Sequence, residues 1–216
     1  MHKLHITLEG NIGVGKSTIL SNVYDHFGIN SGIAYAWEPV HDWETHGFLE
    51  GMYTGKIPHS EFQHIVMNSM FRETYKNLAN TNILLQERSM DTTVQVFSKC
   101  NVNDQESLNI IQYCFNNLKR ILGLSYNINT HRIYLRVPPH IAFSRISSRS
   151  RSSEASVCQN YVNNINNAYE QWLGFIENEH TTIIDAAKST DEVTKDVITT
   201  INKLITHQKT PKTLFA

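Results

Sequence analysis

Residues 10–18 read Gly-Asn-Ile-Gly-Val-Gly-Lys-Ser-Thr and directly follow the apolar run Leu4–Leu8. In the pattern Gly-x4-Gly-Lys-Ser, glycines let several backbone N–H groups turn toward one anion. Lys16 adds a positive charge, and the Ser17 hydroxyl suits Mg²⁺ as a ligand. The stretch therefore predicts a strand, a phosphate-binding loop (P-loop) and a helix, with a nucleoside triphosphate as the expected occupant. A plain glycine-rich turn is the alternative, which the flanking pattern disfavours.

Length and charge narrow the class of protein. The chain has 216 residues, which suit one domain that buries about 70% of the surface of its unfolded chain. Lys and Arg number 19 against 20 Asp and Glu, so the formal net charge is −1. Binders of nucleic acid normally carry a strong basic excess, so we expect small-molecule ligands and no nucleic-acid partner.

Cysteine usage and hydropathy bear on location. The three cysteines, Cys100, Cys114 and Cys158, have no metal-ligand spacing and are too scattered to suggest a disulfide framework, which favours a reducing, cytoplasmic compartment. We expect no signal or transit segment, because the first strand begins by Lys3. No apolar run approaches the length of about 18 residues that a membrane span needs, so we expect no membrane partner.

The rest of the chain alternates short apolar runs with amphipathic stretches, which predicts an α/β protein with a parallel sheet of about five strands flanked by helices. Four further strands are expected at Ile33–Trp37, Ile83–Leu85, His131–Leu135 and Thr181–Ile184. Helices are expected at Gly15–Phe27, Ser60–Leu78, Asp104–Leu122, Pro138–Arg149, Val157–Asn178 and Thr190–His207. We predict a single domain over residues 1–207, with a frayed tail over 208–216.

Glu38 follows the predicted strand Ile33–Trp37, in the segment Trp37-Glu38-Pro39-Val40-His41-Asp42-Trp43. A carboxylate at the carboxyl end of a strand, beside a phosphate cradle, can deprotonate an acceptor hydroxyl before it attacks a γ-phosphate. Glu38 is therefore a candidate catalytic base. A solvated loop carboxylate is the alternative, and Trp43 is also compatible with a core position.

A second strand, within Leu84-Leu85-Gln86-Glu87-Arg88-Ser89, ends in an acid and an arginine. The acid can hold Mg²⁺ directly or through water, and the guanidinium can bind the transferring phosphoryl oxygens. The pair Glu87 and Arg88 thus suits phosphoryl transfer. A salt bridge that caps a helix is the alternative, which the P-loop disfavours.

Three arginines, Arg145, Arg149 and Arg151, alternate with serines in a run that ends at Glu154. Serines give such a segment mobility and arginines give it affinity for anions, as a lid over ATP phosphates requires. We therefore predict an arginine-rich lid at about residues 145–156. A solvated basic loop, a phosphorylation site or a nuclear-localisation patch are the alternatives.

Together these segments resemble the deoxyribonucleoside kinase family, the animal and viral enzymes related to deoxycytidine, deoxyguanosine and mitochondrial thymidine kinases. The resemblance covers nearly the whole length of the chain. It is carried by Gly10–Thr18, Glu38-Pro39 with Trp43, Met52-Tyr53, Phe62-Gln63, Glu87-Arg88-Ser89 with Phe97, Tyr134-Leu135-Arg136, the lid, Tyr161, Glu170-x-Trp172-Leu173 and Asp185-Ala186.

The resemblance implies a P-loop kinase fold, with ATP and Mg²⁺ as cofactors, and a role for each matching residue. Glu38 would take the proton of the nucleoside 5′-hydroxyl, while Arg88 and Lys16 would stabilise phosphoryl charge. Ser17 and Glu87 would organise Mg²⁺. The implied ATP contacts are Gly10, Asn11, Ile12, Gly13, Val14, Gly15, Lys16, Ser17, Thr18, Arg149 and Arg151 at the phosphates, and Asp185, Ala186 and Ala187 around the adenine.

The resemblance also implies contacts to the acceptor. Gln63 would read the base edge, between Trp43 and Phe97, while Tyr53 and Glu154 would bind the 3′-hydroxyl. The interval between Tyr53 and Gln63 is one residue shorter than the family norm, which leaves Met52 as an alternative sugar ligand. An arginine that the family pattern has near Val94 is missing here.

Base preference follows from the expected lining of the acceptor pocket. Val66 and Met70 lie one and two helical turns beyond Gln63, so we expect both to face the base. Relatives that prefer deoxycytidine or purines resemble one another in carrying an arginine near the position of Met70 and an aspartate near that of Thr93. Both residues are uncharged in this chain. The resemblance and this neutral pocket predict ATP-dependent 5′-phosphorylation of deoxyribonucleosides, thymidine first and deoxycytidine second.

Two alternatives stay open. A thymidylate-type nucleoside monophosphate kinase shares the P-loop and lid but needs a cationic site for the phosphate of its acceptor, for which Arg72 is the arginine available before Arg88. A non-catalytic nucleotide-binding switch is the other, which intact Lys16, Glu38 and Arg88 disfavour. Family likeness also suggests a homodimer built on the long helices Ser60–Leu78 and Asp104–Leu122.

Overall fold

The protein forms one central sheet covered by helices on both faces. The computed structural model describes residues 2–149, 154, 156–175 and 180–209. The strands are β1 (His2–Glu9), β2 (Ile33–Ala36), β3 (Ile83–Glu87), β4 (Asn127–Arg136) and β5 (Thr181–Asp185).

The longer helices alternate with these strands, and short helical segments lie between them. The longer ones are α1 (Lys16–Phe27), α4 (His59–Asn80), α7 (Gln105–Ser125), α8 (Pro139–Arg149), α9 (Gln159–Leu173) and α10 (Thr190–Lys209). The short ones are η1 (Ile29–Ser31), α2 (Val40–Thr45), α3 (Phe48–Tyr53), α5 (Met90–Thr92), the π-helical turn η2 (Thr93–Phe97) and α6 (Ser98–Asn101).

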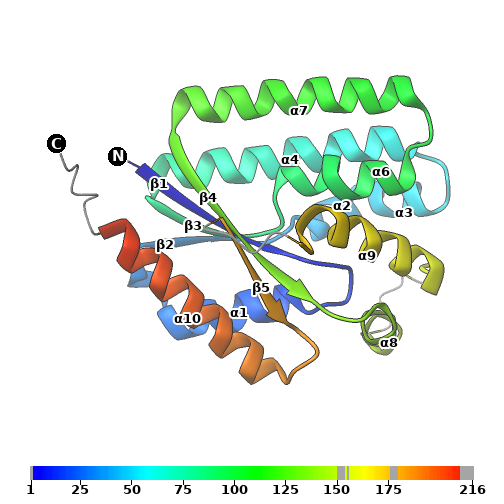
Figure 1. Ribbon diagram of the computed structural model, residues 1–216. Coiled ribbons are helices and arrows are strands. Elements are labelled where there is room, and N and C mark those ends of the chain that lie inside the picture. Colours follow the sequence, from blue (N-terminus) through cyan, green and yellow to red (C-terminus); the bar gives the residue numbers. More distant parts are fainter. Residues whose placement is uncertain (1, 150–153, 155, 176–179, 210–216) are drawn as a thin grey trace.

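The strand order is β2-β3-β1-β4-β5, and every neighbouring pair is parallel (Figure 1). The predicted α/β class, with a five-stranded parallel sheet flanked by helices, is confirmed. Parallel strands bring all their carboxyl ends to one edge of the sheet, where ligands of such folds bind. The loops after β1, β2 and β3 therefore meet at that edge.

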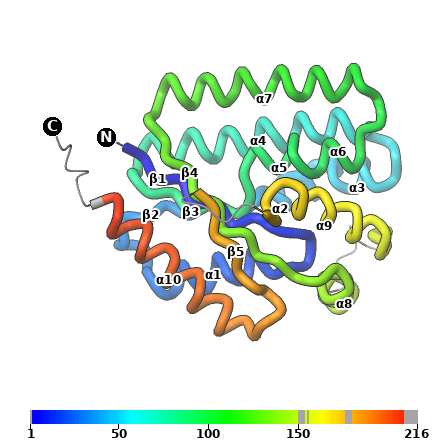
Figure 2. Tube along the Cα trace, viewed as in Figure 1, coloured from blue at the N-terminus to red at the C-terminus, as the bar shows by residue number. Residues whose placement is uncertain are grey.

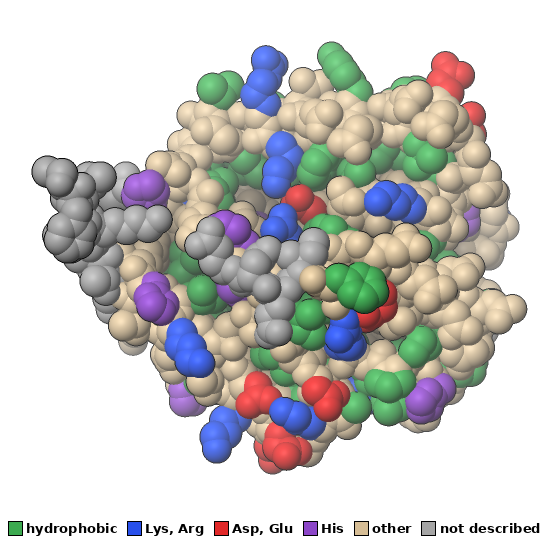
Figure 3. Space-filling model, viewed as in Figure 1, with side chains coloured by type: hydrophobic (Ala, Val, Ile, Leu, Met, Phe, Trp, Pro, Cys, Tyr) green, Lys and Arg blue, Asp and Glu red, His purple; other side chains and the backbone are tan. Residues whose placement is uncertain are grey.

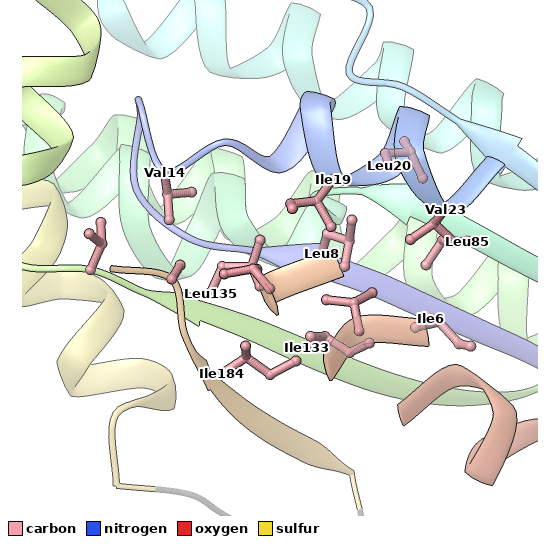
Figure 4. Packing of buried hydrophobic residues seen from close by; sticks show 14 of the residues in the cluster. Ile6, Leu8, Val14, Ile19, Leu20, Val23, Leu85, Ile133, Leu135 and Ile184 are labelled. Carbon is pink, nitrogen blue, oxygen red and sulfur yellow. The ribbon is translucent and has the colours of Figure 1, made fainter. Parts of the chain in front are cut away.

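The alternation of side chains along β1 places it between two helical layers. Leu4, Ile6 and Leu8 are at most 2% exposed and pack toward α1 and α10. Figure 4 shows Leu8 beside Ile19 of α1. His5 faces the opposite layer of α4 and α7, where it lines a small cavity. Both views of the backbone show α1 and α10 on one side of the sheet and α4 and α7 on the other (Figures 1 and 2).

Helix α7 shows why the amphipathic stretches became helices. The Asp104 carboxylate accepts hydrogen bonds from the backbone N–H groups of Glu106 and Ser107, which caps the first turn. Ile111 and Phe115 then lie on the buried face at i and i+4 spacing, 1% and 8% exposed. The predicted helix is therefore present, and its apolar residues lie on the buried face.

Several boundaries differ from the sequence prediction. Strand β4 begins at Asn127, four residues before the expected His131. Helix α9 ends at Leu173 rather than Asn178, because Gly174, a poor helix former, follows and its carbonyl accepts a hydrogen bond from Arg136. Gln208 lies within α10 and donates to the carbonyl of His2, so the predicted frayed tail is helical at its start. Its residues 210–216 lie outside the described part.

No helix within the described ranges is long and apolar enough to cross a membrane.

Candidate active site

A cavity of about 530 Å³ opens at the carboxyl edge of the sheet. It brings together the P-loop after β1, the segment after β2, the end of β3 and the start of the predicted lid. The predicted site residues that line it are Ile12, Gly13, Gly15, Lys16, Ser17, Thr18, Glu38, Trp43, Tyr53, Gln63, Val66, Glu87, Arg88, Phe97, Arg149 and Glu154.

The P-loop depends on glycines at crowded positions. Gly10 and Gly13 have φ of 145° and 78°. A Cβ on Gly10 would lie 2.7 Å from the carbonyl oxygen of Leu135, and one on Gly13 would lie 2.5 Å from that of Ala142. Asn11 anchors the loop, because its side chain accepts from the N–H of Ile12 and donates to the carbonyl of Val162 on α9. Its amide is thus engaged in loop structure.

Lys16 begins helix α1 beneath this loop. Its Nζ donates to the carbonyl oxygens of Gly10 and Asn11, at 3.1 and 2.8 Å. Burial, and after it the charge of Arg88, lowers the pKa of Lys16 to about 7. A phosphate beside Nζ would favour the charged ammonium. Together with the N-terminus of α1, Lys16 has the charge and position that suit an anion at the cavity wall.

Glu38 and Arg88 form an ion pair inside the cavity. Arg88 Nη1 lies 2.7 Å from Glu38 Oε1 and 2.5 Å from Oε2, and the two side chains are 9% and 11% exposed. Burial alone would lower the pKa of Arg88, but the charge and hydrogen bond of Glu38, together with the nearby Tyr169 and Glu87, raise that pKa above its ordinary value. The guanidinium is therefore charged, and it holds the Glu38 carboxylate beside the P-loop.

The backbone at Arg88 is unusual. Its φ is 59°, the only positive φ among the non-glycine residues that the structure describes. A non-glycine residue in this left-handed region costs about 1 kcal/mol or more, and such residues gather at functional sites. The N–H of Arg88 still donates to the carbonyl of Leu8 in β1. The guanidinium carbon also lies 4.9 Å from the ring centroid of Phe97, which the π-helical turn η2 presents to the cavity.

Ser17 and Glu87 are adjacent, as a magnesium site would need. Ser17 Oγ donates to Glu87 Oε1 at 2.8 Å. Burial, and then the charge of Glu38, raises the pKa of Glu87. The described residues hold no cluster of three or more His, Cys, Asp or Glu side chains that could enclose a metal ion. One hydroxyl and one carboxylate nonetheless fit Mg²⁺, which keeps several waters and takes its other oxygens from phosphates.

The far end of the cavity is largely apolar with a few polar groups. Trp43 is 4% exposed, donates from its indole Nε1 to Ser69 Oγ at 3.1 Å, and meets the ring of Phe62 edge-on. Gln63 is 3% exposed, and its Oε1 has no hydrogen-bond partner among the described residues. An unpaired buried acceptor at a cavity wall suits a ligand that donates a hydrogen bond.

Met70 and Thr93 differ from their expected positions, because neither lines the cavity. Both are 1% exposed. Met70 packs with Met67 and Met90 in the apolar cluster beneath α4, and the Thr93 hydroxyl has no partner among the described residues. Val66, one turn beyond Gln63, does line the cavity as predicted.

Arg149 and Glu154, both within the predicted lid, pair with each other. Arg149 donates to both carboxylate oxygens of Glu154, from Nε at 2.8 Å and from Nη2. Tyr53 lies near this pair, and burial, then the charges of Tyr161 and Glu154, raises its pKa. Arg151 lies outside the described residues, as do residues 150, 152, 153 and 155 of the predicted lid.

A second, smaller cavity of about 260 Å³ lies on the other side of the P-loop, and Arg149 lines both cavities. Its predicted lining residues are Gly13, Val14, Gly15, Thr18, Arg149 and Ala186. Asp185 is exposed, and its carboxylate accepts from the N–H of Ala187, so these two residues shape the loop rather than line the cavity.

Sequence reasoning missed several neighbours of these cavities. Asn101 lines the larger one and donates from Nδ2 to the Tyr161 hydroxyl at 3.1 Å. It lies four residues after Phe97, a helical spacing that could have identified it. Arg145, expected in the lid, instead donates to the carbonyls of Val14 and Ala186, which ties the P-loop to the loop after β5.

Comparisons with known proteins all find deoxynucleoside kinases. The family model described as deoxynucleoside kinase matches residues 6–206. A thymidine kinase of Ictalurid herpesvirus 1 (strain Auburn) is 30% identical over 197 residues, covering 88% of this chain and 82% of the relative. Fowlpox virus (strain NVSL) has a relative described as a probable deoxycytidine kinase, 28% identical over 182 residues, covering 81% and 73%.

A solved structure is similar in fold. It is that of deoxyadenosine kinase from M. mycoides with the products dCMP and a flexible dCDP bound. The TM-score is 0.72 at 22% identity, and the match covers 92% of this chain and 99% of that one.

Proposed function

This chain belongs to the deoxynucleoside kinase family, and we propose from this membership that it transfers the γ-phosphoryl group of ATP to the 5′-hydroxyl of a deoxyribonucleoside. The observation that carries the proposal is the Glu38–Arg88 ion pair. In this pair a carboxylate and a charged guanidinium lie near the P-loop lysine, inside a cavity with an apolar end.

In this mechanism the proton of the 5′-hydroxyl goes to a Glu38 carboxylate oxygen as the 5′-oxygen bonds to the γ-phosphorus. The bond from that phosphorus to the bridging oxygen of ADP breaks on the opposite side. Arg88 and Lys16 stabilise the charge on the transferring oxygens, and buried cations do so more strongly than exposed ones. Mg²⁺ held near Ser17 and Glu87 would neutralise phosphate charge.

The two cavities support an assignment of donor and acceptor. The smaller one, between the P-loop and the loop after β5, suits the adenine of ATP, with Ala186 at its wall. The larger one suits the nucleoside, with Gln63 at the base edge and with Tyr53 and Glu154 near the sugar 3′-hydroxyl. Arg149, which lines both, suits the phosphates between them.

Thymidine, followed by deoxycytidine, is the proposed order of acceptors. Val66 and Phe97 give the base pocket a neutral wall, and the amide of Gln63 can pair with either pyrimidine edge. Met70 is buried behind this wall and carries no charge that would favour another base. Purines, which are larger, should be poor acceptors.

A monophosphate kinase has less support. Among the described residues at the larger cavity the cations are Lys16, Arg88 and Arg149, and the two arginines already pair with carboxylates. Arg72 bonds to Asp42 on the exposed surface instead. Intact Lys16, Glu38 and Arg88 likewise favour a catalyst over a nucleotide-binding switch.

We also propose a cytoplasmic homodimer. Exposed apolar residues gather on α7, where Tyr113 is 70% and Leu124 81% exposed, while Tyr75 on the adjacent α4 is 40% exposed. Apolar area of this kind is what a second copy of the chain would cover. Lys and Arg side chains are interspersed with Asp and Glu on the face in Figure 3, which suits small-molecule substrates better than nucleic acid.

The test is a phosphate-transfer assay with Mg-ATP and, separately, thymidine, deoxycytidine, deoxyadenosine, deoxyguanosine and dTMP. We expect the largest kcat/KM for thymidine and the next for deoxycytidine. Glu38→Gln should lower kcat about 100-fold or more with ATP binding kept. Glu61→Gln, a change at an exposed residue that is not part of the cavity lining, should leave kcat unchanged. Turnover of dTMP alone, or unchanged kcat in Glu38→Gln, would contradict the proposal.

A further inference from the structure

Glu9 is a carboxylate buried at the end of β1 that the proposed mechanism does not use. It is 0% exposed and directly precedes Gly10, the first residue of the P-loop. A buried carboxylate is costly unless its oxygens are hydrogen-bonded. The partners of Glu9 therefore indicate what the residue does.

Two hydroxyl donors to Glu9 come from the segment that follows Arg88. Ser89 Oγ donates to Glu9 Oε1 at 2.8 Å, and Thr92 Oγ1 donates to Glu9 Oε2 at 2.6 Å. Ser89 is the N-cap residue of α5, but its side chain makes no capping hydrogen bond and bonds to Glu9 instead. Helix α5 therefore lacks a side-chain cap, because the Ser89 hydroxyl bonds to Glu9 instead of to the first turn of the helix.

These bonds fix the chain on the far side of the strained residue. Arg88 lies between β3 and α5 with φ of 59°, and its own N–H is held by Leu8. Such a conformation persists only where the surroundings over-determine it. Glu9, rigid because it pairs with Tyr134 in the sheet, supplies the second attachment, immediately beyond Arg88.

Tyr169 completes the surroundings of the guanidinium. It is 0% exposed and stacks on Tyr134, with ring centroids 5.6 Å apart. Burial raises the pKa of the Tyr169 hydroxyl. The charge of Arg88 lowers this pKa, and the charge of Glu9 raises it further. Tyr169 thus lies close enough to both residues to feel their charges, which puts the Glu9 carboxylate in the electrostatic environment of Arg88 as well.

We propose that Glu9 is a positioning residue, which holds Arg88 against Glu38 and the reacting phosphoryl group by anchoring Ser89 and Thr92. The inference rests on the proposed function for its kinetic consequence. It assigns Glu9 no contact with substrate. Its effect passes through the backbone of Arg88, so a loss of Glu9 should disturb the transition state more than the binding of either substrate.

The first test is Glu9→Gln. An amide has one acceptor oxygen in place of two, so one of the two hydroxyl contacts loses its acceptor. We expect kcat to fall roughly tenfold or more, with KM for ATP and nucleoside within about twofold of wild type. Ser89→Ala and Thr92→Ala should each lower kcat in the same way, since each removes one donor. They also serve if Glu9→Gln folds poorly.

The matched control is His5→Gln. His5 lies on the same strand and the same face, is also buried, and bonds to Gln86 rather than to the segment after Arg88. It should keep the wild-type kcat. Equal loss of kcat in His5→Gln and Glu9→Gln would overturn the proposal in favour of a general packing effect.

A double-mutant cycle separates positioning from an independent role. Placed on Arg88→Lys, the change Glu9→Gln should lower kcat far less than it does in the wild type, because both act through one side chain. The same fold-loss on both backgrounds would overturn the proposal. If the wild type phosphorylates no deoxyribonucleoside, the proposed function fails on its own.

A readout without turnover tests the positioning directly. Hydrogen exchange of the Arg88 guanidinium, followed by NMR in ¹⁵N-arginine protein, should be faster in Glu9→Gln than in the wild type or His5→Gln. Unchanged exchange at Arg88 would overturn the proposal whatever reaction the protein catalyses.

Discussion

Acidification from pH 7 to pH 5 should destabilise the protein through His5. Its ring is 7% exposed, and Nε2 lies 3.0 Å from Gln86 Oε1. Burial lowers the pKa of His5 to about 4, against 6.5 for an ordinary histidine. Between these two values the unfolded chain binds a proton that the folded chain does not. The contribution of His5 to stability is therefore complete above about pH 6.5, and it is lost as the pH falls toward 4.

The two pKa values give the size of the effect. With about 6.5 in the unfolded chain and about 4 in the folded chain, the free energy of unfolding falls by about 2 kcal/mol from pH 7 to pH 5 on account of His5 alone. Other groups also titrate over this range, so the prediction concerns the difference between wild type and His5→Gln, whose amide does not titrate and retains a hydrogen-bonding group toward Gln86.

Urea unfolding of both proteins at pH 7 and pH 5 measures that difference. The wild type should lose about 2 kcal/mol more than His5→Gln on acidification. His207→Gln, a change at an exposed histidine of α10, is the matched control and should keep the wild-type pH dependence. The same loss in wild type and His5→Gln would refute the reasoning.

Three further predictions test other parts of the molecule. Gly13→Ala should lower the free energy of unfolding by about 2 kcal/mol or more, because its Cβ would lie 2.5 Å from a carbonyl oxygen of α8. The control is Gly55→Ala, at a similar φ but with open space around it, which should lower the free energy of unfolding by only about 1 kcal/mol in the same denaturation assay. Glu87→Gln should raise the Mg²⁺ concentration for half-maximal rate about tenfold, and an unchanged requirement would remove Glu87 from the metal site. Leu124→Asp should shift a homodimer toward monomer in sedimentation, whereas Ile29→Asp, exposed away from α7, should not; equal masses would exclude that face of α7 as the interface.

The sheet and its carboxyl edge could be predicted because parallel strands leave strong local signals. A buried run such as Leu4–Leu8 identifies a strand without reference to distant contacts. Once β1, β2 and β3 are parallel neighbours, Glu38, Glu87 and the P-loop must meet. The cavity residues in these segments could therefore be predicted from the sequence.

Met70 could not be placed from spacing alone. It lies seven residues after Gln63, close to two helical turns, so the two share a face of α4. Seven residues also advance about 10 Å along the helix axis, which carries Met70 past the end of the cavity and under Met90. Periodicity gives the direction of a side chain, whereas the extent of a cavity depends on the elements packed around it.

The short helices could not be predicted from the sequence for a related reason. Helices α2 and α3 span six residues each, too few for a periodic apolar pattern to show. The π-helical turn Thr93–Phe97 has no period of its own, and tertiary contacts decide it. The ion pair of Arg149 with Glu154 was also missed, because the family pattern assigned its two members to different ligands.

The opposite characters of the two faces of β1 have a consequence for folding. Leu4, Ile6 and Leu8 fill one layer, while the other face carries His5, Thr7 and Glu9, each at most 7% exposed. A slip of one residue would turn the polar side chains into the apolar layer, and a slip of two would carry Glu9 away from its hydroxyl donors. The polar groups thus select a single register of β1 against β3 and β4. The same register places the P-loop, which follows β1, at the carboxyl edge of the sheet.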